Sequence, residues 1–205
     1  MAIFKIAAGE NGKATVYRTE KDLRNLLFYS YNHSSFRIMK NLYLIGTEGA
    51  IECIYHQMLY LQWRRVKSLN TRALHYILSF DTLRWEKDVD QKTMTDIMSF
   101  LNEYLFVEYQ HMLFLHLDKQ SHYHIHMIVN PVNINTLHLC RETWKSIGWQ
   151  IADLFLHGSN TPLLAAFKKR EARAGYPAAC CGVVHLITCI IFRCSLLHIE
   201  IIMGE

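Results

Sequence analysis

The part of this sequence best equipped for chemistry is a histidine-rich segment with the composition of two strands and a polar loop. Residues 116–133 read HLDKQSHYHIHMIVNPVN, and aromatic and long apolar residues fill 109–117. Two such runs separated by the polar residues 119–121 predict a β-hairpin. Because strand side chains alternate between faces, the hairpin would place one polar set on a single face, made of His116, Asp118, His122, His124 and His126.

A turn centred on Gln120 would bring this polar set together in pairs. His116 would lie opposite His124 and Asp118 opposite His122, with directly opposed Cβ atoms about 5 Å apart. Four imidazoles and a carboxylate are costly to bury without a partner, and a divalent metal satisfies several imidazoles at once. We therefore expect a metal-binding hairpin. The same pattern also suits an exposed edge strand whose histidines are only solvated.

Hydrophobic periodicity predicts the elements that position this hairpin. Thr19 offers a helix cap with acidic residues in the first turn that follows. The predicted helices lie near 19–31, 50–66, 90–106 and 142–157. The predicted strands are 73–81, 109–118 and 122–130, and 3–8 and 14–17 predict an opening hairpin, with 32–49 as a loop. The fold class is therefore α+β, with a mostly antiparallel central sheet flanked by helices.

The composition limits which classes of protein are compatible with the sequence. The 205 residues are 51% hydrophobic and 20% charged, which is the balance of one globular domain with a core. A net charge of +4 is compatible with a polyanionic partner but does not require one. The six cysteines show no metal-binding spacing, and no secretory signal pattern opens the sequence. We expect reduced thiols and a cytoplasmic protein.

The last 41 residues differ from the rest. Residues 165–173 are basic, and 178–203 are apolar with only Arg193 and Glu200 charged. The uninterrupted apolar run 178–192 falls short of the about 20 residues that a membrane span needs. We expect a domain over 1–164 and a tail over 165–205. The tail is compatible with a buried element, a membrane-adhering end or a shifted coding-sequence terminus.

The histidine segment resembles the metal motif of the relaxase/mobilisation nuclease family, MobA-type members of the His-hydrophobe-His (HUH) endonucleases. The pattern is His116-x7-His124-x-His126, followed by Ile-Val-Asn-Pro-Val-Asn, and the similarity runs from about Thr19 to Leu164. The resemblance implies a relaxase-like palm in which these three histidines hold a divalent metal, Mg or Mn. Ligand preference alone also admits Zn, Ni or Cu.

The same resemblance assigns the residues around the metal. Asp118 is the first choice as the acceptor that orients a ligand histidine, and Asp81 is the second. His122 breaks the family spacing and is placed outside the ligand set. The segment 73–81 resembles the family's second motif, whose His75 and Ser79 would lie near the DNA; alternation puts both on one face with Ile77 and Asp81.

The resemblance also points to a nucleophile. Residues 23–29 resemble the segment that carries the family's catalytic tyrosine, here Tyr29, with Tyr31 as the second choice. Tyr29 lies off the apolar helical stripe made of Leu23, Leu26, Leu27, Ser30 and Tyr31. In the implied reaction Tyr29 attacks a phosphodiester, giving a 5′-phosphotyrosyl link and a free 3′-hydroxyl, and no nucleotide cofactor is needed.

The implied partner is single-stranded DNA at the transfer origin of a plasmid or mobile element, with accessory mobilisation proteins and a secretion or coupling apparatus. A basic cluster after the second predicted helix would bind phosphates or would simply be a solvated helix end, and comprises Arg64, Arg65, Lys67 and Arg72. Two other functions share these features: a replication-initiator or transposase-type nuclease with the same core, and a catalytically inactive DNA-binding remnant.

Overall fold

The computed structural model describes residues 2–7, 15–44, 49–65, 67–81, 91–119 and 122–141, together with Ile147 and Gln150. Its elements are β1 (Ala2–Ile6), α1 (Glu20–Asn32), β2 (Phe36–Lys40), α2 (Ala50–Trp63), β3 (Leu74–Asp81), α3 (Gln91–Tyr104), β4 (Tyr109–Lys119) and β5 (His122–Asn133). The strands form one antiparallel sheet in the order β1-β3-β5-β4-β2. The predicted α+β class with an antiparallel central sheet is confirmed.

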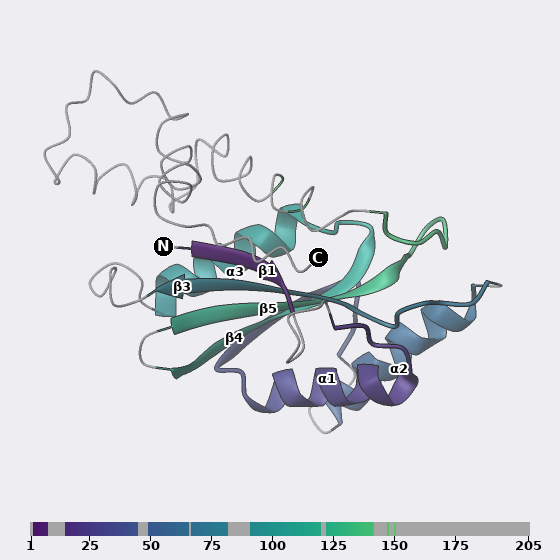
Figure 1. Ribbon diagram of the computed structural model, residues 1–205, viewed down its shortest axis with the longest axis horizontal. Helices are drawn as coiled ribbons and strands as arrows, with labels where there is room; N and C mark the ends of the chain where they lie inside the picture. Colours follow the sequence, from purple (N-terminus) through teal and green to yellow (C-terminus); the bar gives the residue numbers. More distant parts are fainter. Residues whose placement is uncertain are drawn as a thin grey trace, which may run out of the picture.

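Helices cover both faces of this sheet (Figure 1). α1 and α2 pack on one face, where Leu27 and Ile54 meet Met112, Phe114 and Ile128 of β4 and β5. α3 packs on the other face against the alternate residues of the same strands, and its buried residues are Met94, Ile97, Met98 and Leu101. Because β4 and β5 are apolar on both faces over most of their length, they form the centre of the sheet. No helix among the described residues is long and apolar enough to cross a membrane.

α1 begins where the sequence predicts. The Thr19 side chain accepts a hydrogen bond from the Asp22 backbone N–H, and the Asp22 carboxylate accepts one from the Thr19 N–H. This capping box satisfies two donors that the helix itself leaves unpaired. Its backbone contacts also lower the pKa of Asp22. The predicted stripe is largely confirmed, since Leu23, Leu26, Leu27 and Ser30 are buried.

The structure corrects two predictions at the sheet edges. β1 pairs along its length with β3, and within the described part of the predicted hairpin residues 15–17 form no strand, although the Thr15 N–H donates to the Ala7 oxygen at 2.9 Å. Part of the predicted loop 32–49 is β2, which pairs with β4. Arg37 and Lys40 give β2 the charged character of an edge strand, and this masked its periodicity. The predicted helix over 142–157 and the tail over 165–205 lie almost wholly outside the described residues.

The histidine hairpin exists, with one correction to its register. His116 lies opposite His124, as predicted. An irregularity between His116 and Lys119 then places Lys119 opposite His122, so the predicted pairing of Asp118 with His122 is wrong. β4 has one more residue than β5 over this interval, which is how a β-bulge interrupts the strict alternation of side chains. Strand alternation therefore does not predict which face of the sheet Asp118 lies on.

Candidate metal centre

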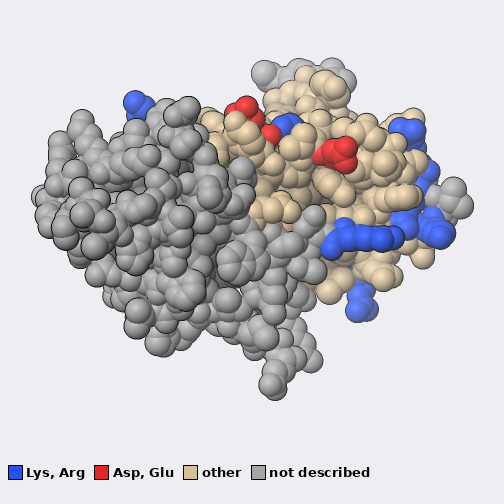
Figure 2. Space-filling model, turned by 90° about the horizontal axis from the view of Figure 1, so that it is seen from above, with Lys and Arg blue, Asp and Glu red and all other residues tan. Residues whose placement is uncertain are grey.

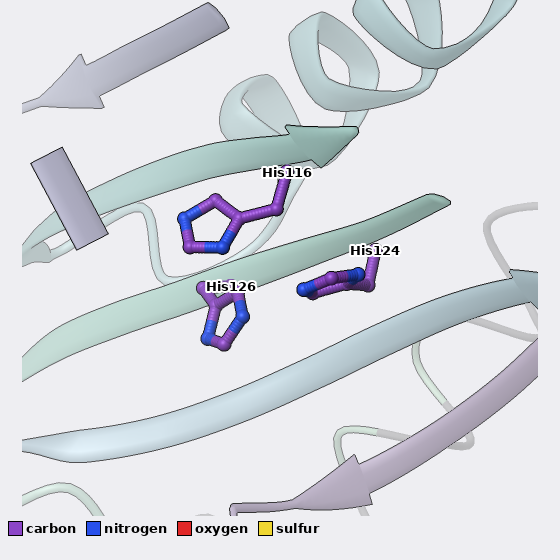
Figure 3. Close-up of side chains that lie close together, drawn as sticks. All are labelled: His116, His124 and His126. Carbon is purple, nitrogen blue, oxygen red and sulfur yellow. The ribbon is translucent and has the colours of Figure 1, made fainter. Parts of the chain in front are cut away.

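Three histidines from the central hairpin converge on one point. His116 of β4 and His124 and His126 of β5 each offer a ring nitrogen, and these nitrogens lie within 4.8 Å of one another (Figure 3). The ring centroids are 4.4 Å apart for His116 and His126, 5.2 Å for His116 and His124, and 5.0 Å for His124 and His126. His116 and His126 are only 1% and 8% exposed, whereas His124 is half-buried. The cluster therefore opens to solvent at His124.

The strand pairing explains why these side chains meet. Residues directly opposite in an antiparallel pair project from the same face. His116 is opposite His124 on β5, and β3 places Ser79 opposite His124 and Ile77 opposite His126. All of them lie on the face that α1 and α2 cover. Along β5 this face changes from the buried Ile128 to His126 and then to His124, so the imidazoles begin where the apolar core under the helices ends.

The C-terminal end of α1 binds one of the three histidines. His116 Nε2 lies 3.1 Å from the backbone oxygen of Ser30. A carbonyl oxygen only accepts, so Nε2 carries the proton and Nδ1 carries the lone pair. The last carbonyls of a helix lack helical partners and carry its partial negative charge, which favours a cation nearby. The helix end therefore fixes the His116 tautomer and complements a positive ion.

Tyr29 lies beside this cluster. Its side chain is 54% exposed, and its ring centroid is 6.3 Å from that of His116. His33 flanks it: the two rings are 4.4 Å apart, and His33 Nδ1 donates to the Tyr29 carbonyl at 2.7 Å. His33 was not selected from the sequence, although its position four residues after Tyr29 is the spacing at which helical side chains become neighbours.

Tyr31 is placed differently. It is half-buried and packs against the core between α1, α2 and the sheet. The Arg37 guanidinium lies 3.8 Å above its ring centroid, and the same Arg37 donates to the Tyr31 carbonyl at 3.4 Å. A ring held between a core and a cation has less freedom to approach a substrate than the exposed ring of Tyr29. The geometry therefore favours Tyr29 over Tyr31 as a nucleophile.

A fourth histidine lies behind the cluster. His75 Nε2 lies 2.7 Å from His126 Nδ1, and His75 Nδ1 lies 2.7 Å from the Tyr17 hydroxyl. Burial, together with the neighbouring His116, lowers the pKa of His75 to about 4. His75 is therefore a neutral imidazole near pH 7, able to accept a proton from one neighbour and donate to the other. No feature of the sequence pointed to Tyr17.

The other predicted residues fall into two groups. The side chains of Asp81, Asp118 and His122 lie outside the described part of the chain, although β3 places Asp81 opposite His122. Ser79 is opposite His124 on the histidine face. The His116 ring contacts the Ser30 carbonyl, and the His126 ring contacts the His75 ring.

The predicted basic cluster lies toward the other end of α1. Arg72 forms an ion pair of 3.7 Å with Glu20, the first residue of α1, and donates to Gln62 at 3.2 Å. Glu20 and Ser30 are roughly 15 Å apart along the helix axis, at about 1.5 Å per residue. Arg64 and Lys67 are exposed, and Figure 2 shows Lys and Arg side chains gathered toward the right-hand end of the molecule, where α2 ends in Figure 1. Arg72 thus has structural partners, while Arg64 and Lys67 face solvent.

Comparison with known families identifies the fold. The model for the relaxase family, MobA/VirD2-like nuclease domain, matches residues 31–154. This range is more than half of the chain and contains the three converging histidines. The chain belongs to the relaxase family. No curated protein and no solved structure matches it. The match begins just after Tyr29, so the assignment of this relaxase does not depend on the choice of nucleophile.

The histidine cluster of this relaxase fits a divalent metal. Relaxases are metal-dependent nucleases that bind single-stranded DNA, and the cluster supplies three neutral nitrogen ligands. The hydrogen bond from His116 Nε2 leaves its Nδ1 deprotonated, as a metal ligand must be. The contact of His126 Nδ1 with His75 assigns Nε2 as the ligand atom of His126. The donor set does not select one metal.

Proposed function

We propose that this relaxase nicks one DNA strand at the transfer origin of a plasmid or mobile element, with Tyr29 as the nucleophile, to start conjugative mobilisation. The observation that carries the proposal is the placement of Tyr29. Its exposed ring lies 6.3 Å from the His116 ring, and the next residue, Ser30, accepts a hydrogen bond from His116. One helix end thus holds both the attacking group and a metal ligand.

The metal would be held by His116, His124 and His126. Mg²⁺ or Mn²⁺ is the expected ion, with Zn²⁺ compatible with the same ligands, and when bound it polarises the phosphate and neutralises charge in the transition state. Because the three ligands are neutral imidazoles, the site keeps the positive charge of the ion and attracts a phosphate. The half-buried His124 lies on the side from which a DNA strand would enter.

In the proposed reaction the Tyr29 hydroxyl attacks the phosphorus of a phosphodiester. A phenol is mostly protonated at neutral pH, so its proton passes to a base as the oxygen attacks phosphorus. The bond from phosphorus to the 3′-oxygen breaks, that oxygen gains a proton, and the 5′ end stays on Tyr29 as a phosphotyrosyl ester. The free 3′-hydroxyl can later reverse the step. The phosphotyrosyl ester conserves the free energy of the cleaved phosphodiester bond, so the reaction requires no nucleotide cofactor.

The surface around Tyr29 suits a single strand. Tyr29 and His33 provide exposed aromatic rings, and the exposed Arg37, stacked on the neighbouring Tyr31, provides a cation. Aromatic platforms with adjacent cations bind single-stranded nucleic acid by base stacking and phosphate contacts. In the proposal the strand passes this surface at the reacting phosphate and extends toward the exposed Arg64 and Lys67. Accessory mobilisation proteins and a coupling apparatus would complete the transfer reaction.

A covalent-adduct assay tests the proposal. Purified protein is incubated with labelled single-stranded origin oligonucleotides and Mn²⁺ or Mg²⁺ and then resolved under denaturing conditions. The native protein is expected to form a DNA adduct that EDTA prevents. Tyr29→Phe should bind the oligonucleotide without forming the adduct, and Tyr31→Phe should still form it. A native protein that binds an origin and a metal but forms no adduct would instead support a DNA-binding remnant.

A further inference from the structure

Three side chains from separate parts of the chain form a continuous line that ends at the histidine cluster. Tyr17 lies in the extended segment before α1, His75 lies on β3, and His126 lies on β5. The Tyr17 hydroxyl is 2.7 Å from His75 Nδ1, and His75 Nε2 is 2.7 Å from His126 Nδ1. We call this line the Tyr17–His75–His126 relay.

The relay restricts where the protons can lie. If His126 binds a metal through Nε2, its Nδ1 carries the proton and donates to His75 Nε2. His75 must then carry its own proton on Nδ1, where the only partner in the relay is the Tyr17 oxygen. Tyr17 therefore accepts a hydrogen bond in the metal-binding arrangement. The opposite arrangement, in which Tyr17 donates and each ring passes its proton along, would put the His126 proton on Nε2 and block metal binding there.

The Tyr17 hydroxyl is held firmly enough to act as the end of this line. The Tyr17 backbone oxygen accepts hydrogen bonds from the Arg72 backbone N–H and, at 3.3 Å, from the Thr71 hydroxyl. The ring packs against the core beneath α1 and α2. Burial, with the charge of Asp22 as a smaller cause, raises the pKa of Tyr17 to about 12, so the group remains a neutral hydroxyl that can accept as well as donate.

We propose that Tyr17 is a positioning residue for the metal ligand His126: through His75 it fixes the tautomer and the ring plane that present His126 Nε2 to the metal. This inference rests on the metal site of the proposed function and deepens it. It assigns to Tyr17, which lies outside the histidine cluster, a role in metal affinity. It also gives the buried His75 of β3 a specific part in holding the ligand set.

Metal affinity measured by titration calorimetry with Mn²⁺ tests the relay without relying on activity. Removal of an outer partner of a ligand histidine costs about 10- to 100-fold in metal affinity. We expect His75→Leu to lose metal affinity within this range. His75→Gln should lose less affinity, because its amide oxygen can still accept a hydrogen bond from His126 Nδ1. Tyr17→Phe should weaken metal binding by about tenfold. The control is Tyr55→Phe. Tyr55 is a buried tyrosine of the same core, and its hydroxyl has no hydrogen-bond partner among the described residues. This substitution should leave the metal affinity unchanged.

Two further readouts separate a positioning role from a structural one. Thermal unfolding shows whether Tyr17→Phe and Tyr55→Phe remain equally folded at the titration temperature. Nitrogen-15 NMR of the imidazoles, with and without Zn²⁺, reports which His126 nitrogen is protonated. The relay predicts Nδ1–H in the Zn²⁺-loaded protein and a changed tautomer ratio in metal-free Tyr17→Phe. Native metal affinity and an unaltered His126 tautomer in Tyr17→Phe would overturn the inference. If the native protein binds no metal, the proposed metal site fails, and the metal-free tautomer comparison still decides whether the relay exists.

Discussion

The backbone oxygen of Ser30 accepts a hydrogen bond of 3.1 Å from Nε2 of His116. Ser30 is buried on the core face of α1, and its neighbour Tyr29 is exposed on the other side of the same helix turn. The contact therefore ties the position of the proposed nucleophile to the position of a proposed metal ligand. A displacement of the C-terminal turn of α1 would disturb both at once, whereas changes at the N-terminal end of α1 should not.

Thr19→Ala tests this separation. The substitution removes the side-chain half of the capping box at the start of α1 and should cost about 1 kcal/mol of unfolding free energy. Because the cap is roughly 15 Å from Ser30 along the helix, Mn²⁺ affinity should match that of the native protein. Urea unfolding gives the first quantity, and calorimetry under conditions where both proteins are folded gives the second. A parallel loss of metal affinity would show that the two ends of α1 are coupled.

The ligand set can be tested at its most accessible member. His124→Ala removes a half-buried side chain, so the fold should tolerate it better than the loss of the buried His116. Mn²⁺ binding is expected to weaken by more than about 100-fold, since even changes to outer partners cost about 10- to 100-fold. His138→Ala, an exposed histidine outside the cluster, is the matched control. Equal metal affinity in the two variants would refute the ligand assignment.

His111 predicts how stability depends on pH. Burial lowers the pKa of this histidine to about 4, and its Nε2 lies 3.1 Å from Asn102 Oδ1. The unfolded chain, with a histidine pKa near 6.5, binds the proton first, so this contribution to stability is full above about pH 6.5 and is lost as the pH falls toward 4. Its size is on the order of 3 kcal/mol.

A comparison of His111→Gln with the native protein measures this contribution. Glutamine keeps an amide that can hydrogen-bond but does not titrate in this range. The unfolding free energy of the native protein should decline more steeply between pH 6.5 and 4.5 than that of the variant. Parallel curves would mean that His111 is not held neutral in the folded state.

Arg37 tests the proposed DNA surface. Arg37→Ala should weaken single-strand binding and reduce the slope of log affinity against log salt by about 0.7, the value for one phosphate contact on a single strand. Lys92→Ala removes the same charge from α3, on the opposite face of the sheet, and should leave the slope unchanged. Fluorescence anisotropy over a salt series provides the measurement. An unchanged slope for Arg37→Ala would exclude a phosphate contact there.

The local features of the fold were predictable from the sequence. The pairing of His116 with His124 follows from a short loop and strand alternation, and the start of α1 follows from Thr19 and Asp22. α3 follows from its apolar stripe, all of which is buried. Each of these depends on residues that are close together in the chain, where hydrogen bonding and side-chain periodicity act directly.

The other features of the fold depend on contacts between segments that are far apart in the sequence. Local sequence patterns do not predict such contacts. β1 had the composition of a hairpin strand, but its partner is β3, and the paired residues are at least 70 positions apart in the sequence. β2 was hidden because its charged residues suit an exposed edge. The bulge that displaces Asp118 adds one residue without any glycine or proline signal. The contact between Tyr17 and His75 joins segments that are 58 residues apart in the sequence.

In the proposed reaction Tyr29 carries the cleaved DNA strand. The most direct measurement is mass spectrometry of the covalent adduct after nuclease and trypsin digestion. Trypsin is expected to release residues 25–37, NLLFYSYNHSSFR, which contain Tyr29, Tyr31 and His33 together, so fragmentation of this one peptide distinguishes the three. A nucleotide phosphate is expected on Tyr29, and it should disappear when the metal is chelated before DNA is added. A phosphate on Tyr31 or His33, or on any residue outside this peptide, would contradict this assignment.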